Sequence, residues 1–387
     1  MNKLFTDMLR TDDGPMSHGE SSYSYLNNSN RIEAARIRQV LEDWYCMYKD
    51  KNKNLLRRFQ SLDEIPHVSA AFELYLHKLF SRLGYSIIIH PETTSRKMTK
   101  PDFLLQKDSL SPFYVEAVIA SDSSSNNRAT ERRMNVLYEQ IEKIKNRDFF
   151  LMLSVRGRPD SQPSGAKLRK ELENWLGSLN PDSIPRDNPD AWPKNKWNHE
   201  GWEIEFTALP RSVEKRGRKD IRIIGSFMPE VRRKNTWKSI RDSVVAKRNN
   251  FGEIDRGLVV AVNVDSSHLD SIEEMEALFG QEQFLFSVGA SQDEPEFQRA
   301  RNGIWNGPEG PRCTRVSAVM FFQNLHPWTF GVKGANLYLN PWAQFPIDGP
   351  LLELDHVVVD NNGRLKQING KKPYEVLGLQ KEWPMVE

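Results

Sequence analysis

The strongest constraint on the fold is an amphipathic helix that is followed directly by a short apolar strand. Apolar residues recur at helical spacing from Val68 to Leu83, which predicts a helix with one buried face. Gly84 follows, in position to end the helix in the left-handed conformation that favours glycine. Residues 85–90 (YSIIIH) then have the length and composition of a buried strand. This succession predicts an α/β fold.

Further strands and helices follow in an order typical of a mixed sheet. Residues 102–106 and 113–120 are apolar runs joined by a short polar loop, which predicts an antiparallel hairpin. A helix is expected at about residues 130–146, a strand at 149–155 and a helix at 167–179. We therefore predict a mixed central sheet flanked by helices, with a second α/β half.

Composition divides the chain into four stretches. Residues 1–29 are rich in Ser, Asn, Asp and Gly and are expected to form a flexible N-terminal arm. Residues 30–179 hold the predicted core, and residues 180–201 have the prolines and tryptophans of a linker or loop. Residues 202–387 form the second half. Its expected elements are strands at 202–209, 257–264 and 314–323, a helix at 236–249 and an edge segment at 337–341.

Positive charge is concentrated in one stretch of the chain. The 387 residues have a formal net charge of only +2. Between Thr207 and Asn250, however, thirteen Lys or Arg stand against four acids, a net charge of +9. Such a stretch attracts phosphates through counterion release, although a solvated face of a loop-rich insert would have the same composition. The expected nucleic-acid contacts are Arg216, Arg218, Lys219, Arg232, Arg233, Lys234 and Lys238.

Cysteine content and the N-terminal sequence bear on the compartment. Cys46 and Cys313 are too few for a disulfide framework or a zinc site, and they suit a reducing compartment. The first residues, MNKLFTDMLRTDDG, are too polar for a signal peptide. No run approaches the ~18 apolar residues of a membrane span. We therefore expect a cytoplasmic protein without a membrane partner.

Three carboxylates stand where a hydrolytic metal site would need them. Asp102 opens one strand directly after Pro101, and Glu116 interrupts the apolar run FYVEAVIA of the next. An ionised carboxylate in such a run is costly unless it is paired or metal-bound. Glu73 flanks the buried stripe of the preceding helix, about 20° from Phe80 on the helical wheel. Mg²⁺ is usually held by one or two carboxylates with water and substrate phosphate, so the three predict a metal cluster. Each residue taken alone has another explanation. Glu73 could be a solvated residue beside the buried stripe, Asp102 a turn or strand-start residue, and Glu116 an exposed residue of an edge strand.

This order of helix glutamate, Pro-Asp strand, strand glutamate and following helix resembles the PD-(D/E)XK nuclease superfamily. The resemblance covers residues 68–155 and rests on Glu73, Pro101–Asp102 and Glu116. It implies a restriction endonuclease-like core in which Asp102 and Glu116 bind Mg²⁺ or Mn²⁺ and Glu73 supports the site. The implied reaction is hydrolysis of phosphodiester bonds, in DNA rather than RNA.

One position departs from the superfamily pattern. The pattern ends in Glu-x-Lys, whereas here Glu116 is followed by Ala117 and Val118. Positions 116 and 118 face the same side of a strand, so the lysine that would assist catalysis is missing there. In the superfamily this lysine can migrate to another element. Candidates in this chain are Lys145, Lys100 and Lys97.

Besides a structural or interaction subunit of a larger defence complex, which would dock through the Trp- and Pro-rich loop of residues 180–201, two functions stay open on the sequence. The first is a metal-dependent endonuclease, for which phage defence is the setting suggested by analogy. The second is a catalytically degenerate nuclease-fold module that binds nucleic acid or a partner protein within a defence complex, and Val118 favours it. Self-association is left open as well.

Overall fold

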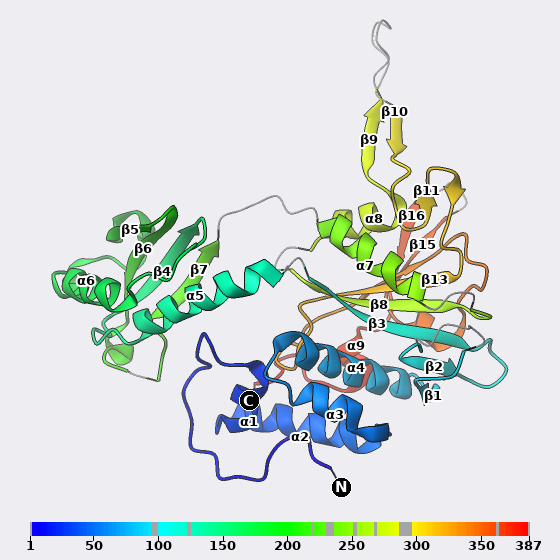
Figure 1. Cartoon of the computed structure of the whole chain (residues 1–387), viewed down its shortest axis with the longest axis horizontal. Coiled ribbons are helices and arrows are strands. Elements are labelled where there is room, and N and C mark those ends of the chain that lie inside the picture. Colours follow the sequence, from blue (N-terminus) through cyan, green and yellow to red (C-terminus); the bar gives the residue numbers. More distant parts are fainter. Residues whose placement is uncertain are drawn as a thin grey trace, which may run out of the picture. The chain divides into compact units, whose positions relative to one another are not determined.

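The computed structural model divides the chain into two compact units (Figure 1). One unit comprises Met1–Met8, Ile32–Asp122 and Asn235–Glu387, and the second comprises Leu9–Arg31 and Ser123–Lys234. The second unit is therefore inserted into the first, whereas the sequence suggested a second half that begins at residue 202. The structure describes residues 2–93, 100–121, 125–218, 220–229, 236–250, 254–266, 269–285, 296–360 and 364–385.

The large sheet of the first unit starts from the expected helix and hairpin. Helix α4 (Glu64–Arg82) is followed by Gly84, whose φ of 84° is the expected left-handed conformation. Strands β1 (Ser86–Ile89), β2 (Phe103–Gln106) and β3 (Phe113–Ser121) then form an antiparallel meander. The helix and the hairpin are thus confirmed, with ends that differ by a few residues.

The strand beside β3 comes from far along the chain. β3 pairs in parallel with β8 (Leu258–Asp265), and β8 pairs in parallel with β13 (Val316–Gln323). Every residue of β8 except the last is buried, as its apolar sequence LVVAVNVD requires of a strand covered on both faces. In the described part of the chain this sheet has eight strands in the order β1-β2-β3-β8-β13-β14-β15-β16, completed by β14 (Asn336–Leu339), β15 (His356–Val359) and β16 (Leu365–Ile368).

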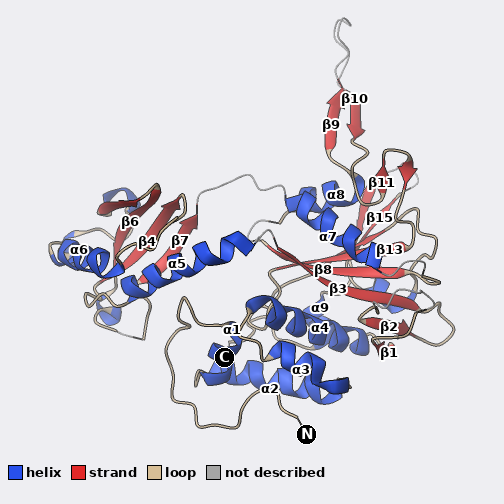
Figure 2. Cartoon of the chain, in the orientation of Figure 1, coloured by secondary structure: helices blue, strands red, loops and turns tan. Residues whose placement is uncertain are grey.

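Helices cover both faces of the large sheet (Figure 2). On one face lie α7 (Thr236–Asn250) and α8 (Ser271–Phe279), and Ile240 of α7 shares a core with Val260 of β8. On the other face lies α4, whose Phe72 and Tyr75 contact Phe322 of β13. The first unit is therefore a mixed α/β sheet flanked by helices, as predicted. The helices that pack on α4 are α2 (Ile32–Met47), α3 (Asn54–Phe59) and α9 (Pro373–Leu377).

The second unit has a sheet and a core of its own. Its α5 and α6 cover one face of the sheet, where Leu137 and Leu168 pack with Leu153 and Ile204. The helices of this unit are α1 (Ser22–Asn28), α5 (Ser125–Glu142) and α6 (Gly165–Gly177). Among the described residues its sheet has the order β5-β6-β4-β7, formed by β5 (Lys194–His199), β6 (Trp202–Pro210), β4 (Phe149–Arg156) and β7 (Ile224–Pro229).

The sheet membership of β4 and β14 differs from expectation. β4 was expected to extend the sheet of β3, but it pairs with β6 and β7 in the second unit. β14 was expected at an edge, but it lies between β13 and β15. Sequence periodicity marks a strand without naming its partner, so both pairings depend on tertiary structure.

Two stretches expected to lack regular structure contain it. β5 lies within the 180–201 linker and forms a hairpin with β6 through Glu200 and Gly201, whose φ values are 49° and 83°. It is a polar edge strand of which only Trp197 packs on the core, so no apolar period marked it. The expected N-terminal arm contains α1, in which Tyr25 and Leu26 are buried.

Two short hairpins complete the described structure of the first unit. They are β9 (Glu282–Leu285) with β10 (Glu296–Arg299), and β11 (Asn306–Gly307) with β12 (Gly310–Pro311). Within the described ranges, no helix combines the length and the apolar composition that crossing a membrane requires.

The buried carboxyl group of Glu274 on α8 makes the stability of the first unit depend on pH. Glu274 is 3% exposed and accepts hydrogen bonds from Asn336 Nδ2 and Tyr338 Oη, each at 2.9 Å. Burial raises the pKa of Glu274 from 4.5 to about 7. The folded protein then holds this proton more tightly than the unfolded chain does. The stabilisation is complete below about pH 4.5 and is lost as the pH rises through about 7.

We therefore expect wild type to lose stability relative to Glu274→Gln between pH 5 and pH 8, by roughly 1–3 kcal/mol. Urea denaturation at a series of pH values measures the difference. Glu309→Gln, at an exposed position of the same unit, is the control and should stay within ~0.5 kcal/mol of wild type. A difference between wild type and Glu274→Gln that does not change with pH would contradict the assignment.

Candidate functional site

Glu73 lies at the centre of a buried polar cluster between the helices that cover the large sheet. Its side chain is 2% exposed. Tyr48 Oη, just beyond the end of α2, donates to Glu73 Oε1, and the guanidinium of Arg58 on α3 forms an ion pair with Oε2. His90 Nε2, at the end of β1, lies 3.9 Å from Oε1. Both carboxylate oxygens of Glu73 are thus satisfied by the protein itself.

The electrostatics of the cluster hold this pairing in place. Burial, then the charge of Glu73 and its hydrogen bond, then the charge of Asp102, raise the pKa of Tyr48, so the hydroxyl remains a donor. Burial tends to lower the pKa of Arg58, but the attraction and hydrogen bond of Glu73, with the attraction of Asp102, raise it overall. Burial, with a smaller effect of Lys78, lowers the pKa of His77 to about 4, so His77 is neutral at pH 7.

Asp102 and Glu116 occupy opposed positions in the hairpin of β2 and β3. The register pairs Phe103 with Val115, and continuing it by one residue sets Asp102 opposite Glu116. Asp102 lies just before β2, where its Oδ2 accepts a hydrogen bond of 2.7 Å from the backbone N–H of Ala117. Asp102 therefore completes the edge of β3 where the backbone pairing with β2 ends.

Glu116 and Glu73 belong to opposite layers of the first unit. Tyr114 and Val118 share the core with α7, and side-chain alternation places Glu116 on their face of β3. Phe103, which is paired with Val115, faces the other way and contacts Phe80 of α4. The helix that carries Glu73 therefore covers the face of the sheet opposite to that of Glu116. Val118 is 5% exposed, so position 118 is filled by the apolar core.

Each lysine proposed for catalysis is paired with another residue, belongs to the second unit or lies outside the described residues. Lys100 Nζ pairs with Glu92 on the surface. Lys145 is exposed and follows the end of α5 at Glu142, so it is not on the apolar side of that helix, and it belongs to the second unit. Lys97 lies outside the described residues. The cation beside Glu73 is Arg58.

Glu73, Asp102 and Glu116 do not come together in the structure as the three-carboxylate cluster that the sequence predicted. Nowhere among the described residues do three His, Cys, Asp or Glu side chains come together as ion ligands. The oxygens of Glu73 accept from Tyr48 and pair with Arg58, and Asp102 Oδ2 accepts from a backbone N–H. The arrangement supports charge neutralisation inside the protein.

The basic stretch of residues 207–250 is divided between the two units at residue 234. Arg216 pairs with Asp182 at 2.8 Å, Arg218 pairs with Asp220, and Lys238 is exposed on α7. The remaining predicted contacts lie outside the described residues: Lys219, Arg232, Arg233 and Lys234.

Arg211, which was counted among the basic residues of this stretch, has a structural role. It is 0% exposed and its guanidinium lies 4.3 Å from the centre of the Phe150 ring. It donates to the backbone carbonyls of Phe149 at 3.1 Å, Arg218 at 3.3 Å and Arg222 at 2.8 Å. Arg211 therefore ties the segment that contains residues 218–222 to the start of β4.

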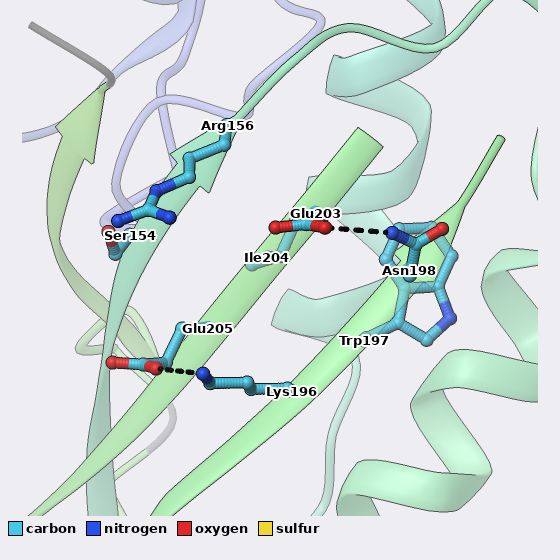
Figure 3. Close-up of a pocket in the computed structure, with 8 residues that line it drawn as sticks. All are labelled: Ser154, Arg156, Lys196, Trp197, Asn198, Glu203, Ile204 and Glu205. Carbon is cyan, nitrogen blue, oxygen red and sulfur yellow. Dashed lines mark hydrogen bonds and ion pairs between the residues drawn. The ribbon is translucent and has the colours of Figure 1, made fainter. Parts of the chain in front are cut away.

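The face of the four-stranded sheet away from α5 and α6 carries a polar depression of about 370 Å³ (Figure 3). Lys196 Nζ lies 3.4 Å from Glu205 Oε2, and Asn198 Nδ2 donates to Glu203 Oε1 at 3.3 Å. Its cationic and anionic side chains are interleaved, so the depression favours no single class of ligand. The polar residues that line it are Ser154, Arg156, Lys196, Asn198, Glu203 and Glu205.

Tyr48, Arg58 and His90 were not among the site residues predicted from the sequence. The only sequence signal for Arg58 is a charged pair, Arg57-Arg58, beside the apolar Leu55, Leu56 and Phe59 of a short helix. Such a pair is usually solvated, and the contact with Glu73 depends on how α3 packs on α4.

Known proteins do not indicate a function for this chain, so the function is inferred from the geometry of the described residues. No family model matches the chain, and searches of the curated proteins and of the solved structures found no significant match.

Proposed function

We propose that this chain is a catalytically degenerate nuclease-type module that binds nucleic acid without cutting it. DNA is the proposed ligand. The observation that carries the proposal is the pairing of Glu73 with Arg58 in the protein interior. Uptake of a metal ion by the buried carboxylate of Glu73 would break its ion pair with Arg58, whose side chain is 31% exposed, so binding of the metal would have to offset the loss of that pair.

The order of elements supports the relation to nucleases. Helix α4, the strands β1, β2 and β3, helix α7 and strand β8 follow one another, with the second unit inserted between β3 and α7. The helix, the Pro-Asp strand and the strand glutamate of the resemblance all lie in this series, and the helix and strand that complete it are α7 and β8 rather than α5 and β4.

The distribution of charge supports nucleic acid as the partner. The stretches of the second unit contain 25 Lys or Arg and 19 Asp or Glu, a formal net charge of +6. Those of the first unit contain 29 Lys or Arg and 33 Asp or Glu, a net charge of −4. A polyanion is attracted by the positively charged second unit and repelled by the negatively charged first unit. We therefore assign nucleic-acid binding to the second unit. A cytoplasmic setting and a role in phage defence remain predictions.

The second candidate function is a metal-dependent endonuclease. It is favoured by one observation, the opposed placement of Asp102 and Glu116 in the hairpin. One or two carboxylates can be enough protein ligands for Mg²⁺ when water and substrate phosphate supply the others.

Incubation of plasmid DNA with the protein in Mg²⁺ or Mn²⁺ separates the two functions. Half of each sample is analysed by native gel electrophoresis, in which bound protein retards the plasmid. The other half is deproteinised and examined for nicked or linear DNA. We expect wild type, Asp102→Ala and Glu116→Ala to shift the plasmid and leave it intact. Cutting by wild type that both variants lose would establish the endonuclease, and absence of a shift would refute binding.

A further inference from the structure

We propose that the second unit holds a binding site for the phosphodiester backbone in a depression lined by Arg31, Arg218 and Arg222. This inference rests on the proposed nucleic-acid binding and names the surface that performs it. The depression has a volume of about 440 Å³, and its walls also include Asp13 and Asp220.

The three arginines come from two separate parts of the sequence. Arg31 ends the N-terminal stretch of the second unit, and Arg218 and Arg222 belong to the segment between β6 and β7. Guanidinium groups present planar pairs of N–H donors that match two oxygens of one phosphate. Arginines at positions far apart in sequence that line one depression can thus contact neighbouring phosphates of one strand.

The segment that carries two of these arginines is held from within the protein. The buried guanidinium of Arg211 donates to the carbonyls of Arg218 and Arg222, the two residues whose side chains line the depression. The backbone at both positions is therefore fixed before any ligand arrives. A fixed backbone lowers the entropy lost on binding.

The aspartates in the depression lower its positive charge but do not prevent a phosphate from binding. Asp220 pairs with Arg218 through Nε at 3.0 Å and through the second guanidinium nitrogen, and the two side chains are 50% and 52% exposed. Exposed pairs of this kind contribute little stability, so a phosphate can replace the carboxylate of Asp220. Asp13 accepts a hydrogen bond from Asn30 at 3.0 Å, within the stretch that ends at Arg31.

The test is binding of a fluorescein-labelled DNA duplex of random sequence, followed by fluorescence anisotropy at several salt concentrations. We expect the double variant Arg218→Ala/Arg222→Ala to bind at least about tenfold more weakly than wild type, and its plot of log K against log salt to be shallower by about 2. The control is Lys167→Ala/Lys170→Ala on α6, at exposed positions of the same unit, which removes the same charge.

A variant with the opposite expected effect guards against misfolding. Asp220→Asn removes the carboxylate that competes for Arg218, so it should bind the duplex more tightly than wild type. Asp187→Asn, at another exposed position of the second unit, is its control. Equal weakening by the arginine and lysine pairs, or equal affinity of the two asparagine variants, overturns the site while leaving the proposed function intact. Failure of wild type to bind the duplex overturns both.

Discussion

Replacing Arg211 with alanine is expected to lower the free energy of unfolding of the second unit by about 3–5 kcal/mol. The side chain is fully buried, and its guanidinium stacks on Phe150 and donates to three backbone carbonyls. Alanine leaves those carbonyls without a donor and opens a cavity beside Phe150, and each of these changes is costly. Urea denaturation measures the loss of free energy. Hydrogen exchange in β4 and in the segment that carries Arg218 and Arg222 shows whether the loss is located there.

Lys215→Ala is the matched control, because it removes an exposed cation four residues away in sequence. It should change the free energy of unfolding by no more than ~0.5 kcal/mol. Arg211→Lys should not restore stability, since an ammonium group lacks the planar fork that reaches several carbonyls at once. If Arg211→Ala were as stable as Lys215→Ala, the structural role of Arg211 would be refuted.

The second large effect is expected for Arg58→Ala, which should destabilise the first unit by about 2–4 kcal/mol. The carboxylate of Glu73 is 2% exposed and would lose its cation, while the hydrogen bond from Tyr48 remains. The side chain of Arg58 is itself 31% exposed, so water can replace part of its contribution. Chemical denaturation gives the size of the loss.

A double variant separates the charge effect from lost packing. Arg58→Ala/Glu73→Gln loses the same side-chain volume at position 58 but leaves no buried charge at position 73, so it should recover most of the stability that Arg58→Ala loses. Arg57→Ala is the neighbouring control, because Arg57 donates only to the backbone carbonyls of Asn52 and Lys53 in the bonds that the structure describes for it. No recovery in the double variant would show that Arg58 acts through packing.

The parts of the fold that local sequence patterns encode were predictable. α4 has a long apolar period and is followed by a glycine, and β2, β3 and β8 are short apolar runs bounded by polar loops. Their pairing was harder to predict, because β4 and β8 are equally apolar and either could have joined β3. The inserted unit decides between them, and the Ser- and Asn-rich run at its start, residues 121–127, has the composition of an ordinary loop. β5 was missed because it is a polar edge strand.

The candidate site was predictable only as a set of residue types. The sequence placed Glu73 on a helix and Asp102 and Glu116 on neighbouring strands. The structure has Glu73 on α4 and Glu116 on β3, with Asp102 directly before β2. The sequence could not show that Glu116 faces α7 while Glu73 lies in the layer on the other side of the sheet. Nor could it separate Arg211, which is buried, from Arg218, which is exposed, within one basic stretch.

We expect the first unit to hold no divalent metal, because Glu73 is paired with Arg58 and Asp102 accepts a hydrogen bond from the backbone N–H of Ala117. Titration of wild type, Asp102→Asn and Glu116→Gln with Mn²⁺ tests this expectation directly. The electron paramagnetic resonance signal of the free ion reports how much Mn²⁺ each protein binds. We expect the three titration curves to superimpose. A saturable Mn²⁺ site in wild type that both variants lose would contradict it and would restore the metal-dependent endonuclease.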